Sequence, residues 1–235
     1  MTLDGPEWFD AGVVVIAPST KVQIVVAAER LLAERGLDGV SLRQIGAEAG
    51  NGNNSAVQYH FGSKDQLIQA IFEYRLPHLH QHRQMLIAER RPDDLRSWVE
   101  CYVLPILEQG EQQDSHYLTF VATLQHHGRR DVFERLPDEY QTSTRSFRER
   151  VGELLPHIPE PLRMHRITQA ITFSVHAASD RERARANREA VLPFAVHVSD
   201  LFDGLLGFLT APVSPAAMAA LDETDPDTLG RPVHL

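Results

Sequence analysis

Polar side chains that can recognise DNA bases stand close together between residues 53 and 58. Asn54, Ser55 and Gln58 belong to a short predicted helix at roughly 54–60. An Asn or Gln amide can form two hydrogen bonds with adenine, and a Ser hydroxyl can bond several bases. These residue types therefore predict direct contacts with base edges in a major groove.

The side chains that follow suit the phosphate backbone. Tyr59, His60 and Lys64 would reach phosphates, as would the backbone amides near Ser63, where the next helix begins. A plainer interpretation stands beside this one: His60 could be a surface residue without a role. Tyr59 and Phe61 could also simply pack in the core of the small domain, and for Phe61 this is the expected position.

Short helices must hold these groups in place. A first helix over 21–35 is indicated by the capping residue Ser19 and the terminating Gly36. Ser41 and Gln44 form a capping-box pattern that opens a helix ending near 49–50, and the Asn and Gly residues at 51–54 indicate a turn. Two short helices joined by such a turn are typical of a helix-turn-helix.

The rest of the chain also has the periodicity of helices. Ser63 and Gln66 suggest a second capping box, and the helix that follows is predicted to run through Pro77 with a kink to about residue 88. Apolar stripes at helical spacing continue to residue 210, with the last two long helices at 162–178 and 191–210. Because no strand-like alternation occurs, the predicted fold is all-α, with an N-terminal three-helix domain and a larger C-terminal helical domain.

These patterns divide the chain into four parts. We expect a flexible arm at 1–18, a helix-turn-helix domain at 19–66, a helical effector-binding and dimerisation domain at 67–211, and a mobile tail at 212–235. The tail is rich in Pro and Asp and poor in large apolar residues.

Composition and charge narrow the class of protein. The net charge of −9 is concentrated outside residues 21–75, where six Lys and Arg residues balance six acids. A neutral segment with well-placed bases can still bind phosphates. No apolar run approaches the roughly 18 residues that span a bilayer, which predicts a cytoplasmic protein with no membrane partner. The single Cys101 excludes an internal disulfide and a multi-cysteine zinc site.

The segment from about Lys21 to Tyr74 resembles the DNA-binding domain of the TetR family of bacterial transcriptional regulators. The resemblance rests on Glu-Arg-Gly-Leu at the end of the first helix, on the spacing from Ser41 to Gly50, and on Tyr-His-Phe-Gly-Ser-Lys at 59–64 followed by Leu67. It implies an all-helical homodimer that represses transcription and releases double-stranded operator DNA when a small effector binds. The DNA contacts that it implies are Thr20, Arg43, Gln44, Asn53, Asn54, Ser55, Gln58, Tyr59, His60 and Lys64.

One residue departs from the family pattern. Gly52 stands where such regulators often have a larger or basic residue. This leaves the rigidity of the turn and one phosphate contact open.

Other chemistries have weaker support in the sequence. His78 and His82 have a spacing that can place two imidazoles on one helix face, but no cysteine or carboxylate cluster accompanies them. The nucleophile elbow, zinc-protease, Walker A and Rossmann patterns of enzymes are missing. We therefore expect no catalytic residue, metal or cofactor, and keep a helical enzyme or metal-binding protein as the alternative.

Two sets of apolar residues in the C-terminal part suggest contacts. The last helix is apolar on two sides, so one side is expected to meet a second copy of the chain. The residues expected at this dimer contact are Ile167, Ala170, Ile171, Ser174, Phe194, Val198, Leu201, Phe202, Leu205 and Phe208, along a seam that also holds Val191, Ala195 and Leu209. Gly204 and Gly207 would allow a close approach.

Aromatic residues in the middle helices predict the effector pocket. The expected lining is Trp98, Tyr102, Tyr117, Phe120, Leu124 and Phe147, although each could simply fill the core. Such a lining suits a mostly apolar small molecule held by one or two hydrogen bonds. An anionic effector is less expected because this part of the chain is acidic, but Arg145 or Arg148 could pair with a carboxylate.

Overall fold

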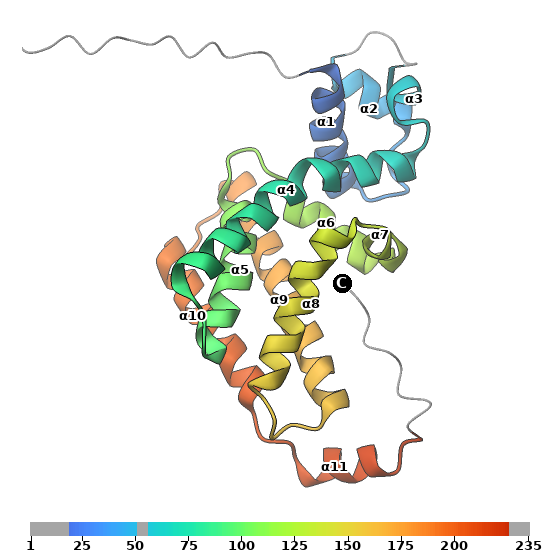
Figure 1. The fold of residues 1–235 in the computed structure, drawn as a ribbon. Coiled ribbons are helices and arrows are strands. Elements are labelled where there is room, and N and C mark those ends of the chain that lie inside the picture. Colours follow the sequence, from blue (N-terminus) through green and yellow to red (C-terminus); the bar gives the residue numbers. More distant parts are fainter. Residues whose placement is uncertain (1–18, 51–55, 226–235) are drawn as a thin grey trace, which may run out of the picture.

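The computed structural model describes residues 19–50 and 56–225, and the described chain is built of helices without strands (Figure 1). The arm expected at 1–18 and the end of the tail at 226–235 lie outside the described residues. The helices are α1 (Thr20–Arg35), α2 (Leu42–Glu48), α3 (Ala56–Phe61), α4 (Lys64–Arg90), α5 (Leu95–Glu111), α6 (Tyr117–His126), α7 (Arg130–Glu134), α8 (Asp138–Glu153), α9 (Glu160–Ala186), α10 (Phe194–Thr210) and α11 (Pro215–Asp222).

Side-chain caps start the helices of the N-terminal domain. The Ser19 hydroxyl accepts a hydrogen bond from the Val22 amide at the start of α1. The capping box at α2 is complete, because the Gln44 amide donates to the Ser41 hydroxyl and the Ser41 amide donates to Gln44 Oε1. Each of these hydrogen bonds satisfies a backbone amide that has no partner within the helix.

The second expected capping box is only half formed. Ser63 accepts from the Gln66 amide at 3.2 Å, but Gln66 Oε1 accepts from the Ser63 hydroxyl rather than from its amide. The Ser63 amide instead donates to the Phe61 carbonyl, in the tight turn at Gly62. Gly62 has a φ of 68°, the left-handed region that favours glycine.

The first three helices and the start of α4 enclose one small core. Ile24, Leu32, Ile45, Val57 and Phe61 are all buried there, so the expected core position of Phe61 is confirmed. The ion pair of Arg30 with Glu48 holds α1 against α2. This core fixes the orientation of α3, the predicted recognition helix.

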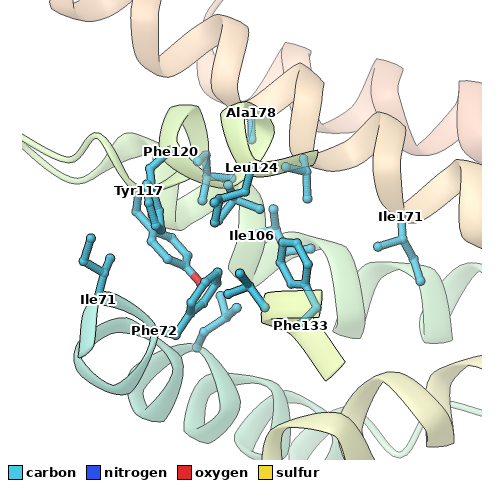
Figure 2. Close-up of a cluster of buried hydrophobic side chains, with 14 of the residues drawn as sticks. Ile71, Phe72, Ile106, Tyr117, Phe120, Leu124, Phe133, Ile171 and Ala178 are labelled. Atoms are coloured by element: carbon cyan, nitrogen blue, oxygen red, sulfur yellow. The ribbon is translucent and has the colours of Figure 1, made fainter. Parts of the chain in front are cut away.

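Helix α4 joins the small domain to the larger bundle (Figure 1). It continues through Pro77 to Arg90, as expected, and packs against α1, α5, α7 and α8. Helix α6 lies against both α1 and α9, so the two parts of the molecule also meet there. Phe72 of α4 is the centre of an aromatic cluster with Tyr117, Phe120 and Phe133, at ring-centroid distances of 5.5–6.1 Å (Figure 2).

The first part of the segment expected to be a mobile tail, after residue 211, is helical. Residues Pro215–Asp222 form α11, which begins with the Ala217 amide donating to the Ser214 hydroxyl. The reason is local: Pro215 suits the first turn, and the alanines that follow have the highest helix propensity. Its side chains are at least partly exposed, so capping and propensity, rather than burial, account for this helix.

Within the described residues, no single helix is both long and apolar enough to cross a bilayer. Helices α10 and α11 reach the length and apolar composition of a membrane-spanning segment only when taken together, and this pair is bent by 54°.

Candidate nucleic-acid interface and ligand cavity

Four side chains of the expected DNA-binding set lie on the outer surface of the small domain. Tyr59 is 85% exposed, and Arg43, His60 and Thr20 are exposed as well. Such exposure leaves all four available to a nucleic-acid backbone. Asn53, Asn54 and Ser55, like the turn glycine Gly52, lie outside the described residues.

Gln58 is exposed but already engaged. Its amide nitrogen donates to the Gly62 carbonyl at 2.6 Å, across the end of α3. To form two hydrogen bonds with an adenine, the side chain would have to leave this carbonyl. The net binding free energy expected from a contact between Gln58 and a base is therefore smaller.

Two further side chains of the predicted interface have structural partners. Lys64 Nζ donates to the Leu37 carbonyl at 2.7 Å and ties the start of α4 to the loop after α1. An ammonium has three donors, so two remain for a phosphate. Gln44 uses its oxygen in the capping box of α2, and among the described residues its amide NH2 group donates no hydrogen bond.

A large cavity of about 890 Å³ lies inside the C-terminal bundle. Helices α4, α5, α6, α8 and α9 contribute to its wall, together with the segment around α7. Its volume is within the range typical of small-molecule sites. Its lining residues on α4 recur at helical spacing: Phe72, Leu76, Leu79 and Arg83.

Two of the six residues expected in the pocket line this cavity, namely Tyr102 and Tyr117. Phe147 is buried one layer behind and stacks on the Tyr102 ring at 4.1 Å. Phe120 and Leu124 are fully buried core residues, and Trp98 is partly buried against the core away from the cavity. Periodicity placed all six on inward faces, but only the packing of neighbouring helices separates cavity wall from core.

Two buried arginines lie on the wall of the cavity. Arg83 and Arg148 are 7% and 5% exposed, and the Arg83 guanidinium lies 3.8 Å from the centre of the Tyr102 ring. Burial lowers the pKa of Arg148 below its ordinary value. The Tyr102 hydroxyl is 2.8 Å from the Thr144 hydroxyl on the same wall. Among the arginines that line the cavity, the sequence indicated only Arg148, as a secondary possibility, and gave no signal for Arg83 or Arg163.

A buried ion pair connects the small domain with the cavity-forming helices. Glu29 of α1 is 1% exposed and binds Arg75 of α4 through two hydrogen bonds of 2.7 and 2.8 Å. Although burial acts to lower it, the contact with Glu29 raises the pKa of Arg75 above its ordinary value. Glu29 also accepts from the backbone amide of His116, at the start of α6. The sequence offered no signal for this contact beyond a charged residue on an apolar helix face.

The dimer contact predicted from the sequence needs correction on α9. Ile167, Ala170, Ile171 and Ser174 are buried within their own chain, because α9 packs against α5, α6, α8 and α10. Most of the α10 seam is also internal, with four residues buried, Leu201, Phe202, Leu205 and Leu209, and two partly buried, Phe194 and Val198.

Other apolar residues are left exposed on these two helices. Phe173 of α9 is 57% exposed, and Val196 and Phe208 of α10 are 51% and 44% exposed. Val191, Ala195, Gly204 and Gly207 are exposed too, and a Cβ built on either glycine would meet no atom within 4 Å.

The histidine pair considered for a metal has another neighbour. The His78 and His82 rings are 6.5 Å apart, and His82 Nδ1 lies 3.3 Å from a carboxylate oxygen of Glu108. Over the described ranges, no group of three or more His, Cys, Asp or Glu side chains is arranged to hold a metal ion. Cys101 is fully buried, and burial raises the pKa of its thiol.

Comparison with known proteins bears on the N-terminal domain. Residues 24–71 match the family model described as "Bacterial regulatory proteins, tetR family". No curated protein matches the chain. Among solved structures, the chain is similar to a proposed transcriptional regulator from Streptomyces coelicolor A3(2), with 19% identity, a TM-score of 0.40, and coverage of 83% of this chain and all of that one.

Proposed function

Because the chain belongs to the tetR family of bacterial regulatory proteins, a family of DNA-binding transcriptional regulators, we propose that it is a repressor controlled by a small molecule. In this proposal two copies of the chain bind a palindromic operator through α2, α3 and the turn between them. A small, mostly apolar effector fills the cavity in the C-terminal bundle and releases the DNA.

The observation that carries the proposal is the connection between the cavity and the small N-terminal domain, which is called the reading domain below because it would contact the DNA. Tyr117, Leu118, Val121 and Gln125 of α6 line the cavity, while the amide of His116 at the start of the same helix binds Glu29 of α1. A displacement of α6 by a ligand would therefore act directly on the helix that supports α2 and α3.

The mechanism that we propose is a shift between two arrangements of the dimer. Two reading domains fit DNA when their recognition helices lie about 34–36 Å apart, the spacing of successive major grooves. The effector would favour an arrangement with a different spacing. To empty an occupied operator, it must prefer the released arrangement by roughly 5 kcal/mol.

Selection from random double-stranded DNA tests this function. The full-length chain should enrich a palindrome whose half-sites are about one helical turn apart. Its affinity should fall steeply with salt, since phosphate contacts release counterions. Recovery of no sequence above the level of non-specific competitor DNA would contradict the proposal.

A further inference from the structure

The cavity is long, and its wall carries both apolar side chains and arginines. On α8 the lining residues run from Gln141 to Gly152 and beyond, and eleven helical steps correspond to roughly 16 Å. The cavity is therefore long enough to bind an extended molecule whose two ends meet different surroundings.

One end of the cavity is apolar. Phe72, Leu76 and Phe133 form it together with Leu118 and Val121, next to the contact between α6 and α1. The rings of Tyr117 and Phe133 both pack against Phe72, at centroid distances of 6.1 and 5.5 Å (Figure 2). This end would bind a hydrocarbon or aryl group.

The other end carries guanidinium groups. Arg83 follows Phe72 by eleven residues on α4, which places it about 16 Å further along the helix. Arg148 of α8 and Arg163 of α9 also line the cavity, as does Gly152, which follows Arg148 by one helical turn. Arg163 Nε is buried and has no hydrogen-bond partner among the described residues, and it lies 3.8 Å from the Cβ position of Gly152.

The buried charge of the wall has one sign. Among the described lining residues, Arg83 and Arg148 are the buried charged groups, while the carboxylates Glu149, Glu153 and Glu160 are exposed at the mouth. A carboxylate bound beside these buried guanidinium groups would gain an attractive charge interaction at low dielectric constant, in addition to the hydrogen bond that Arg83 Nε already donates to the Tyr102 carbonyl at 3.1 Å. The acidic mouth opposes a multiply charged anion such as a phosphate ester, but opposes a singly charged carboxylate much less.

We propose that the ligand of this cavity is an amphipathic carboxylate, bound with its carboxylate at Arg148, Arg83 and Arg163 and its apolar body toward Phe72 and Phe133. The planar guanidinium groups match the two oxygens of a carboxylate. The Tyr102 and Thr144 hydroxyls border the same site. The local arginines outweigh the overall acidity of this part of the chain, because the excess carboxylates on the cavity wall are exposed to water. The inference rests on the proposed function, since it names the effector class of that site.

Calorimetric titration of the full-length chain without DNA tests the proposal, with three probes that share a ten-carbon chain: decanoate, 1-decanol and decylamine. At pH 7.5 decanoate should bind at least tenfold more tightly than 1-decanol, and decylamine should bind most weakly. Equal or tighter binding of the alcohol or the amine would overturn the proposal, as would the absence of decanoate binding at 200 μM.

Variants locate the carboxylate. Arg148→Gln should remove most of the preference for decanoate over 1-decanol, and Arg163→Gln should reduce it. Arg150→Gln is the matched control, because Arg150 is exposed on the same helix and does not line the cavity. An unchanged preference in folded Arg148→Gln would overturn the assignment. If that variant does not fold, Arg163→Gln and the comparison of probes on the unaltered chain still decide it.

These titrations are independent of the DNA selection. Decanoate binding by a chain that selects no DNA sequence would support the carboxylate site and contradict the repressor. Sequence selection by a chain that prefers 1-decanol would do the opposite.

Discussion

At the scale of single residues, the side chains predicted to contact DNA fall into two groups. Tyr59 and Arg43 are exposed and have room to contact a phosphate, whereas Gln58, Lys64 and Gln44 already hold structural hydrogen bonds. A side chain with a partner must exchange one bond for another on binding DNA. Its contribution to specificity is then smaller than that of a side chain held only by water.

This difference gives a prediction for Gln58. Gln58→Ala should weaken binding to the selected DNA site by about 1 kcal/mol, near the lower limit of about 1–3 kcal/mol for a bidentate base contact, and relax the preference at one base pair. The measurement is a fluorescence-anisotropy titration, with repeated selection from random DNA. Gln84→Ala, an exposed glutamine of α4 outside the reading domain, is the control. Unchanged base preference in Gln58→Ala would show that this residue does not read bases.

At the scale of elements, α1 and α6 form the joint between the two parts of the molecule. The Glu29 carboxylate accepts hydrogen bonds from α4 and from the start of α6, so three helices meet at one buried group. A second link is the ion pair of Arg129, which follows α6, with Asp65 in the first turn of α4. Both contacts hold the reading domain against the helices that line the cavity.

Replacement of Glu29 tests the strength of this joint. Glu29→Gln should lower the free energy of unfolding by about 3 kcal/mol, because it leaves the partly buried Arg75 without its counter-charge. It should also speed hydrogen exchange of the α1 amides. Glu34→Gln is the control, since its pair with Arg30 on the same helix is exposed and should contribute less than about 1 kcal/mol. Urea unfolding of both variants provides the measurement, and equal losses would refute a special role for Glu29.

At the scale of the whole molecule, the exposed faces of α9 and α10 are the candidate dimer surface. Phe173, Val196 and Phe208 are large apolar side chains left in water by the single chain. The exposed glycines of α10 would let a second backbone come close. The surface that we propose for a second copy is therefore this outer face, and not the buried Ile167, Ala170, Ile171 and Ser174.

Sedimentation velocity of surface variants tests this assembly. The unaltered chain should sediment as a dimer at micromolar concentration, and Phe208→Asp or Phe173→Asp should shift it toward monomer, since an interface does not accommodate an unpaired charge. Met85→Asp is a suitable control, because Met85 is 57% exposed and belongs to α4 rather than to either of these helices. A dimer that survives both phenylalanine changes would place the interface elsewhere.

Local sequence determined the features that depend on neighbours along the chain. The caps at Ser19 and Ser41 satisfy amides only three residues away, and the apolar period of the long helices follows from 3.6 residues per turn. The motif at 59–64 identified the family for the same reason, since it is one continuous segment. The one cap that differed from its prediction also has a local cause. At Ser63 the capping box is incomplete, because the turn at Gly62 lets the Ser63 amide donate to the Phe61 carbonyl instead.

Tertiary structure alone decided which inward-facing residues line the cavity, which fill the core and which connect the helices. Tyr102 and Phe120 look alike in the sequence as aromatic members of apolar stripes, yet one lines a cavity and the other is sealed in the core. The arginines at 83, 148 and 163 come from three helices, and the Glu29 contacts come from three as well. Periodicity gives the direction of a side chain from its own helix, but not which other helix it meets there. For that reason the cavity, the joint and the exposed dimer face could be found only after the helices were packed.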